Sequence, residues 1–321
     1  MKTAAATLLG LIFAFAGAPL SAQTYPERPL RFVIPFPPGG GADNLARIVG
    51  VAVSERLGQQ VVIDNRAGAG GNIAAELVAK AAPDGYTLLQ ANVAHAISTS
   101  LYRKLNYDLV RDFVPVTQLA SIPFVLAVNP GINVTTVKEL IARAKARPGE
   151  LAYASSGSGG PSHLAMELFK SMAGVEVRHI PYKGAVPGAT DLMAGNVQMM
   201  FFTVSAALPL MSGNRVKAVA IASPRRSALA PDLPTVAESG LPGFEATTWF
   251  GVMTPRGTRT AVIDRLHDAF TTALKMPEVR ERVLRQGFEI VGSAPAVFGE
   301  YVKAEIPKWA KVVKASGASV D

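Results

Sequence analysis

The chain has 321 residues, of which 49% are hydrophobic and 17% are charged. This composition supports about two packed domains and excludes general disorder. The absence of cysteine excludes disulfides, thiolate metal sites, Fe–S clusters and cysteine-linked lipids. The net charge of +8 leaves three classes of partner, which are nucleic acid, an acidic membrane surface and small anions.

The N-terminal residues predict a secretory signal peptide. Lys2 precedes an apolar run from Ala4 to Ala18, and small residues follow as far as Ala22. The apolar run is about 15 residues long, which is shorter than the roughly 20 that cross a bilayer. We therefore expect residues 1–22 to be removed and the mature protein to be periplasmic. Because the chain has no cysteine, we expect no lipoprotein, and export argues against a nucleic-acid partner.

The first part of the mature chain alternates between strand and helix patterns. Strands are predicted at residues 30–36, 61–64 and 86–90, and amphipathic helices at residues 45–56 and 73–81. Such βαβ units build parallel sheets with right-handed crossovers.

The same alternation restarts after residue 125. Strands are predicted at residues 125–128, 151–154, 177–180, 197–202 and 216–223, and helices at 136–146, 164–172, 262–273 and 298–313. Two separate runs of alternating elements predict two α/β lobes.

Two glycine-rich loops, at residues 37–42 and 155–162, each join a predicted strand to a predicted helix. Glycine lets backbone N–H groups approach a ligand closely, and a helix N-terminus offers unpaired N–H groups with a partial positive charge. Two such loops facing one another would bind a carboxylate or a phosphate. The alternative, to which we give equal weight from the residues alone, is that both loops are simple flexible turns.

Motifs for other chemistry do not match. The glycine runs fit neither G-x-G-x-x-G nor G-x-x-x-x-G-K-[ST], and the serines near His163 do not form G-x-S-x-G. Metal-binding spacings are absent from the four histidines, His95, His163, His179 and His267. We therefore expect no cofactor, no metal and no catalytic residue. Two alternatives stay open: an exported serine hydrolase using the Ser155–Ser158 loop, with Ser158 or a neighbour as the nucleophile, and the effector domain of a transcription regulator.

Six blocks of sequence, taken together and in order, resemble one family. The blocks are residues 25–43, 64–73, 83–89, 179–184, 233–238 and 249–251. The set is similar to the Bug family, the periplasmic solute-binding subunits of tripartite tricarboxylate transporters. The resemblance implies a type II periplasmic-binding-protein fold, with residues 28–125 and 247–321 in the first lobe and 126–246 in the second.

The resemblance also implies the function and the partners. A monomer would bind a small organic carboxylate in the cleft between its lobes, close over it and deliver it to an inner-membrane permease. Aliphatic dicarboxylates, citrate-like acids, aromatic carboxylates and amino acids all remain open as ligands.

The same resemblance implies the binding residues, which hold the ligand largely through backbone amides and hydroxyls. The first wall of the cleft is expected to contain Phe36, Gly39, Gly40, Gly41, Ala42, Asp43, Asn92 and His95. The second wall is expected to contain Ser155, Ser156, Gly157, Ser158, Gly159, Gly160, Ser162, His163, Lys183, Phe202, Thr203 and Ser205. A side chain added at Gly40 or at Gly159 is expected to abolish binding.

Overall fold

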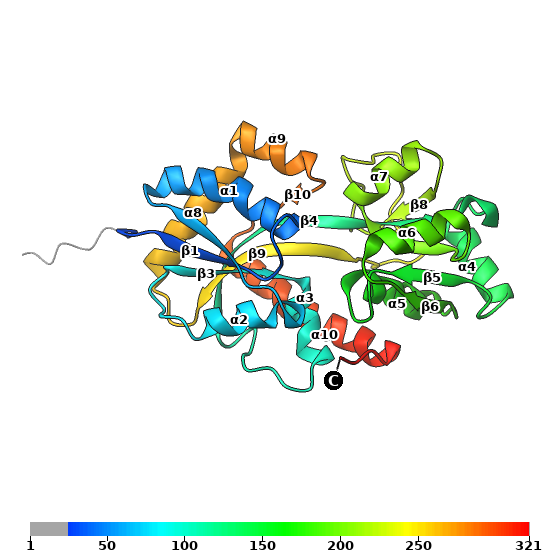
Figure 1. Cartoon of the computed structure of the whole chain (residues 1–321), viewed down its shortest axis with the longest axis horizontal. Helices are drawn as coiled ribbons and strands as arrows, with labels where there is room; N and C mark the ends of the chain where they lie inside the picture. The colour runs from blue at the N-terminus through cyan, green and yellow to red at the C-terminus, as the bar shows by residue number, and fades with distance from the viewer. Residues whose placement is uncertain (1–24, 321) are drawn as a thin grey trace, which may run out of the picture.

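In the computed structural model, which describes residues 25–320, the chain forms two α/β lobes with a cleft between them (Figure 1). The predicted signal peptide, residues 1–22, lies outside the described residues. Within residues 25–320, no helix is long and apolar enough to cross a membrane.

The first lobe begins with a parallel sheet in which β1 (Leu30–Ile34) pairs with both β2 (Val61–Asn65) and β3 (Thr87–Asn92). The loop after β1 leads into α1 (Gly41–Leu57), and α2 (Asn72–Ala79) follows β2 after a short 3-10 turn. All five elements were predicted from the periodicity, with boundaries that shift by a few residues. The helix that follows β3 directly, α3 (Val93–Leu101), was not predicted.

The C-terminal part of the chain returns to the first lobe (Figure 1). It contains α8 (Thr260–Lys275), α9 (Pro277–Arg285), β10 (Glu289–Ile290) and α10 (Pro295–Ser316). The predicted helices correspond to α8 and α10, whereas α9 was missed. α10 contacts α3 of the first lobe and α5 of the second, so it lies beside both lobes.

The second lobe repeats the alternation of strands and helices. After a 3-10 turn (Pro130–Ile132), its elements are α4 (Val137–Ala146), β5 (Ala152–Ser155), α5 (Pro161–Ala173), β6 (Arg178–Pro181), α6 (Ala185–Ala194), β7 (Met199–Thr203), α7 (Val204–Ser212) and β8 (Lys217–Ile221). β5 pairs in parallel with β6 and β7. The sequence patterns missed α6 and α7, which are short and contain Pro187 or Pro209.

Two long strands, β4 (Phe113–Val128) and β9 (Thr247–Pro255), run between the lobes and pair with one another in antiparallel fashion (Figure 1). They join both lobes into one path of strands, in the order β2-β1-β3-β9-β4-β7-β5-β6. The hydrophobic pattern predicted only residues 125–128 of β4. Pro115 and Pro123, together with the irregular register in this pairing, break the alternation that marks a strand.

The predicted lobe boundaries, 125/126 and 246/247, fall inside β4 and at the start of β9. The exact division stays a prediction, because both points lie on the strands that connect the lobes.

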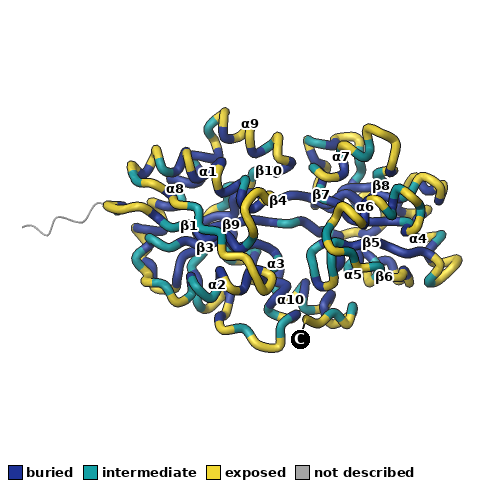
Figure 2. The backbone as a smooth tube through the Cα atoms, viewed as in Figure 1, coloured by how far each residue is buried: buried dark blue, intermediate teal, exposed yellow. Residues whose placement is uncertain are grey.

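The central strands are buried and the outer faces of the helices are exposed (Figure 2). Glu305 of α10 is also buried, and it accepts hydrogen bonds from the indole N–H groups of Trp249 on β9, at 3.0 Å, and Trp309, at 2.8 Å. The Phe298 ring packs directly against Gly251, in the space that a side chain at this position would occupy. These contacts fix α10 against the connecting strand β9.

Candidate functional site

A cavity of about 970 Å³ opens between the two lobes. The ends of β1 and β3 lead to it from the first lobe, and the ends of β5 and β7 lead to it from the second. Ligands of open α/β sheets bind at the carboxyl ends of the strands, so this is the place where the fold favours a site. The connecting strands add Ile122, Thr248 and Phe250.

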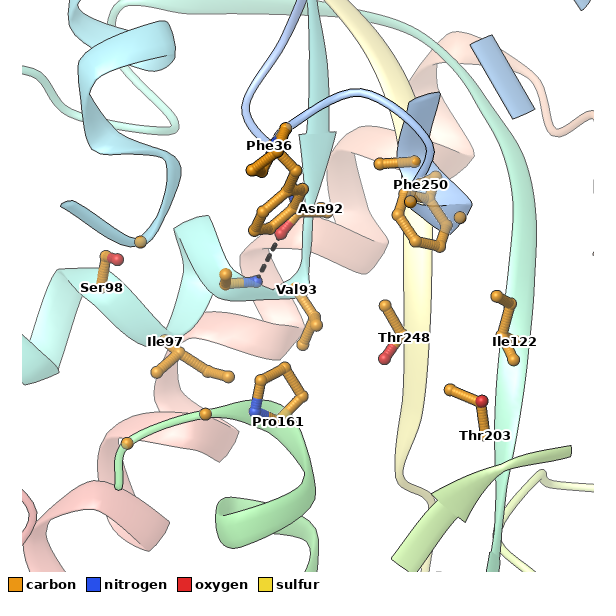
Figure 3. A pocket seen from close by; sticks show the side chains of 18 of the residues that line it. Phe36, Asn92, Val93, Ile97, Ser98, Ile122, Pro161, Thr203, Thr248 and Phe250 are labelled. Carbon is orange, nitrogen blue, oxygen red and sulfur yellow. Dashed lines mark hydrogen bonds between the residues drawn. The ribbon is translucent and has the colours of Figure 1, made fainter. Parts of the chain in front are cut away.

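Figure 3 shows how the labelled side chains lie around this cavity. Phe36 and Asn92 lie on one side, and Thr203 lies on the opposite side. Pro161, at the start of α5, faces Ile97 of α3. The site therefore has two separated ends, and mostly apolar side chains lie between them together with Thr248.

Asp43 holds the first glycine loop in shape. Its carboxylate accepts hydrogen bonds from the Gly39 N–H at 2.9 Å, from Arg47 Nε at 2.9 Å and from Asn65 Nδ2 at 3.0 Å. Burial alone would raise the pKa of Asp43, but the hydrogen bonds from Arg47, Gly39 and Asn65 outweigh it and hold the pKa below its usual range. Asp43 is therefore a buried residue that stabilises the loop, and it does not line the cavity.

Asn92 caps α3 at the wall of the cavity. Its Oδ1 accepts a hydrogen bond from the Ala94 N–H at 2.8 Å (Figure 3), and its own N–H donates to His95 Nδ1 at 3.1 Å. His95 is fully buried, and burial lowers its pKa to about 4 even though its hydrogen bonds to Gly71 and Asn92 oppose the shift. Asn92 is also buried, and its Nδ2 has no hydrogen-bond partner among residues 25–320.

The second glycine loop is held by the first turn of α5. Ser162 Oγ accepts a hydrogen bond from the Ser156 N–H at 3.0 Å and lies 2.9 Å from Ser156 Oγ. His163 Nδ1 accepts a hydrogen bond from the Gly159 N–H at 2.9 Å. Ser162 and His163 thus position the loop from behind, and neither lines the cavity.

Behind this loop, two histidines stack against one another. The rings of His163 and His179 lie 4.0 Å apart, and Tyr153 stacks on His179 at 4.8 Å. Burial, together with the neighbouring His179, lowers the pKa of His163 to about 4. Ser155 Oγ lies 2.6 Å from His179 Nε2, but Ser155 is fully buried and does not line the cavity. Among residues 25–320, no group of three or more His, Asp or Glu side chains is placed to hold a metal ion.

The lobes touch on two sides of the cavity. A Cβ built on Gly159 of the second lobe would lie 2.9 Å from the Leu101 side chain of the first lobe. A Cβ built on Gly287, after α9, would lie 2.6 Å from Cβ of Ser205 on α7. Both glycines have a positive φ, +73° and +83°, which disfavours any other residue. Glycine at these two positions lets the lobes approach one another.

The structure divides the predicted binding residues into two groups. The cavity is lined by Phe36, Gly40, Gly41, Ala42, Asn92, Ser158, Gly159, Gly160, Thr203 and Ser205. The cavity is not lined by Gly39, Asp43, His95, Ser155, Ser156, Gly157, Ser162, His163, Lys183 and Phe202. Several of the second group support the loops, Phe202 is buried in the core, and Lys183 is exposed. Their roles in binding stay a prediction.

Other residues also line the cavity, and of these only Pro37, Pro38 and Pro161 belong to the two predicted glycine loops. They are Pro37, Pro38, Asn44, Gly70, Val93, Ala94, Ile97, Ser98, Leu101, Tyr102, Ile122, Pro161, Thr248, Phe250, Arg285, Gln286 and Val320. Most come from α3, from the connecting strands or from α9, which the periodicity had missed wholly or in part. The apolar spacing of Val93, Ile97 and Leu101 is a helical signal that could have identified α3.

Comparison with known proteins found similarity along most of this chain. Residues 45–318 match the model of the tripartite tricarboxylate transporter family receptor. Protein BugT of Bordetella pertussis is 40% identical over 317 residues, which cover 98% of this chain and 97% of BugT.

Two solved structures are also similar. Rpa4515 of R. palustris, solved with adipate, is 39% identical with a TM-score of 0.76, covering 92% of this chain and 99% of that one. MatC of Rhodopseudomonas palustris, solved with malate, is 33% identical with a TM-score of 0.73, covering 90% of this chain and 100% of that one. The family match spans most of the chain, the relatives span nearly all of it, and the fold is that of periplasmic binding proteins. This chain therefore belongs to the tripartite tricarboxylate transporter receptor family.

Proposed function

We propose that this protein is a periplasmic solute-binding protein, without catalytic activity, that captures a small organic carboxylate between its lobes and delivers it to a tripartite tricarboxylate-type permease. Membership of the receptor family supports the solute-binding role. The relatives solved with adipate and with malate support a carboxylate as the ligand.

The observation that carries this proposal is the unpartnered Nδ2 of Asn92. Asn92 is buried and lines the cavity, yet this N–H₂ group donates to no residue among 25–320. A buried donor left without a partner costs about 1–3 kcal/mol. A ligand carboxylate in the cavity would accept from it and remove that cost.

Two helix N-termini also line the cavity. Gly40 and Gly160 are the N-cap residues of α1 and α5, and neither helix has a side-chain cap. Their first-turn N–H groups lack intrahelical partners, although Pro161 at the start of α5 has no N–H to offer. Each helix N-terminus favours an anion by about 0.3–1 kcal/mol. A carboxylate between the loops would contact both lobes, and its higher affinity for the closed state would favour closure.

Asn92→Asp tests the role of the side chain. The variant keeps an oxygen that caps α3, so the helix should remain, but it replaces the donor with a carboxylate that repels an anionic ligand. We expect calorimetric affinity for adipate or malate to fall at least a hundredfold at pH 7. Circular dichroism and thermal unfolding serve as the control for folding. Unchanged affinity in a folded variant would contradict this use of Asn92.

Export and delivery need separate experiments. The mature protein is expected in the periplasmic fraction, and replacing residues 4–18 with polar residues should retain it in the cytoplasm. Deleting the permease genes should stop uptake of the bound acid without changing its affinity for the purified protein. Unchanged uptake after that deletion would contradict the delivery step.

The hydrolase alternative has one geometric observation in its favour, the Ser155–His179 contact at 2.6 Å. Ser155 is fully buried behind the loop, so a substrate in the cavity would not reach it. We expect no turnover of p-nitrophenyl esters by the purified protein. Turnover that disappears in Ser155→Ala would favour the hydrolase instead.

A further inference from the structure

The cavity has a second polar end, remote from Asn92, and its chemistry narrows the class of ligand. We propose that Thr203, Ser205 and Arg285 form a second carboxylate site, and that the protein prefers an acid with two carboxylates joined by an apolar chain. This inference rests on the proposed function, because it places the first carboxylate beside Asn92.

Charge at the cavity wall excludes one of the open ligand classes. Among the described residues that line the cavity, Arg285 is the only charged side chain, and none is acidic. Asp43 is close in sequence to the lining loop, but its oxygens already accept from Gly39, Arg47 and Asn65. A ligand ammonium group would find no carboxylate partner here and would lose its hydration. The ligand therefore carries no ammonium group, which excludes amino acids.

The middle of the cavity is mostly apolar, with the hydroxyl of Thr248 as its polar group (Figure 3). Val93 and Ile97 of α3 face Pro161 of α5, and Ile122 and Phe250 come from the connecting strands (Figure 3). A chain of methylene groups would be buried against these side chains with a favourable transfer energy. A citrate-like acid would place a central hydroxyl and carboxylate against the same apolar surface, where the lining offers few donors.

The far end offers hydroxyl groups. Thr203 Oγ1 and Ser205 Oγ lie 3.4 Å apart, and Thr203 does not use its hydroxyl to cap α7. Both residues line the cavity, and Figure 3 shows Thr203 on the side opposite Asn92. These hydroxyls can donate to an oxygen of the ligand.

Arg285 belongs to the same end, although it comes from the other lobe. A Cβ at Gly287 would lie 2.6 Å from Cβ of Ser205, so the end of α9 lies against the start of α7. Arg285 and Gln286, directly before this contact, also line the cavity. Arg285 pairs with Glu281, but both side chains are largely exposed, and such pairs contribute little to stability. The guanidinium can therefore exchange Glu281 for a ligand carboxylate. An Arg–carboxylate pair inside a closed cleft is stronger than the exposed pair with Glu281.

Because this end combines Thr203 and Ser205 of the second lobe with Arg285 of the first, a second carboxylate would gain all three partners only when the lobes are close. A dicarboxylate would thus favour the closed state at both ends, whereas a monocarboxylate would favour it at one end.

The experiment compares matched acids on the full mature protein by calorimetry. The dicarboxylates are succinate, glutarate, adipate, pimelate and suberate, and the monocarboxylates are the straight-chain acids with the same carbon numbers. 2-Aminoadipate tests the exclusion of ammonium groups. We expect the best dicarboxylate to bind at least tenfold more tightly than the monocarboxylate of equal length, and 2-aminoadipate to bind at least tenfold more weakly than adipate.

Two variants then locate the second carboxylate. Arg285→Gln and Thr203→Val should each weaken binding of the best dicarboxylate about tenfold and should weaken binding of the matched monocarboxylate far less. Arg282→Gln, on the same helix but outside the cavity lining, is the control and should change neither. Equal affinity for mono- and dicarboxylates, equal losses for both ligands in the variants, or tight binding of 2-aminoadipate would overturn the second site but leave the proposed function standing. If no acid in either series bound, the proposed function itself would fail, and this inference with it.

Discussion

The two walls of the cavity have similar glycine-rich sequences but are held in place by different groups. In the first wall, a charged side chain stabilises the loop: the Asp43 carboxylate accepts hydrogen bonds from Arg47, Asn65 and the Gly39 N–H. In the second wall, uncharged side chains stabilise the loop: Ser162 and His163 accept hydrogen bonds from the loop's backbone N–H groups. The first glycine loop should therefore keep its shape down to lower pH than the second glycine loop.

The glycines of the two walls also differ in the space around them. A Cβ on Gly40 would have its nearest neighbour, the Pro37 carbonyl oxygen, at 3.8 Å. On Gly159 the Cβ would press against Leu101 of the other lobe at 2.9 Å. From the sequence, both glycines were expected to be equally important for binding. In the structure, only Gly159 of the two lies at a contact between the lobes.

Gly159→Ala should have the largest effect. The added Cβ would force the Leu101 side chain of the other lobe to move, and alanine is strained at a φ of +73° by about 1–3 kcal/mol. We expect calorimetric affinity for the bound acid to fall at least a hundredfold, or about 3 kcal/mol.

Gly174→Ala is the matched control for Gly159→Ala. Gly174 ends α5 with a φ of +61° and has nothing within 4 Å of a built Cβ. The Gly174→Ala variant should lose free energy of unfolding, as Gly159→Ala does, but should keep its affinity for the bound acid. Equal affinity losses in both variants would show that strain, and not the lobe contact, is responsible.

Acid should weaken the support of the second glycine loop before that of the first glycine loop. The pKa of His163 is lowered to about 4 in the folded state, so the unfolded chain binds the proton more readily between pH 6.5 and 4. The free energy of unfolding should therefore fall as the pH drops through that range, by at most about 3 kcal/mol from this residue. The stability due to Asp43, whose pKa is lowered, should persist until the pH falls below 4.

His163→Asn isolates this contribution, because its oxygen can still accept from the Gly159 N–H but does not titrate. Thermal unfolding from pH 7 to pH 4 should show a smaller decrease in the variant than in the wild type, with His95 providing part of what remains. Identical pH profiles would argue against His163 as the group that titrates.

Gly40→Ala should have the smallest effect. Its φ of −79° suits alanine, and the surrounding space is open, so the free energy of unfolding should change by less than about 0.5 kcal/mol. Gly40 lines the cavity, so we expect the affinity to fall, but by less than tenfold. A loss as large as that of Gly159→Ala would show that the ligand contacts the first loop as closely as the lobes contact one another.

Much of the fold could be predicted from local patterns. β1, α1 and β2 follow from apolar periodicity, and α4 follows from its capping box, in which Thr136 and Glu139 cap each other. The missed elements have local sequences that conceal them, such as α7 with its internal Pro209 and β4 with its two prolines. Their form depends on pairing and packing with residues distant in the chain.

The sequence alone determined the two α/β lobes, the glycine loops at strand ends and the family, because these depend on short-range periodicity and on ordered motifs. Only the tertiary structure showed that Asp43, His95 and His163 support the loops behind the cavity, since hydrogen-bond direction and burial are set by the packed lobes. Only the tertiary structure showed that Arg285 and Ser205 lie at the same end of the cavity, although they belong to different lobes and are 80 residues apart in the sequence. The small size of Gly287 allows this close approach of the lobes. Contacts between distant segments are fixed by packing across the cleft, which no local pattern records.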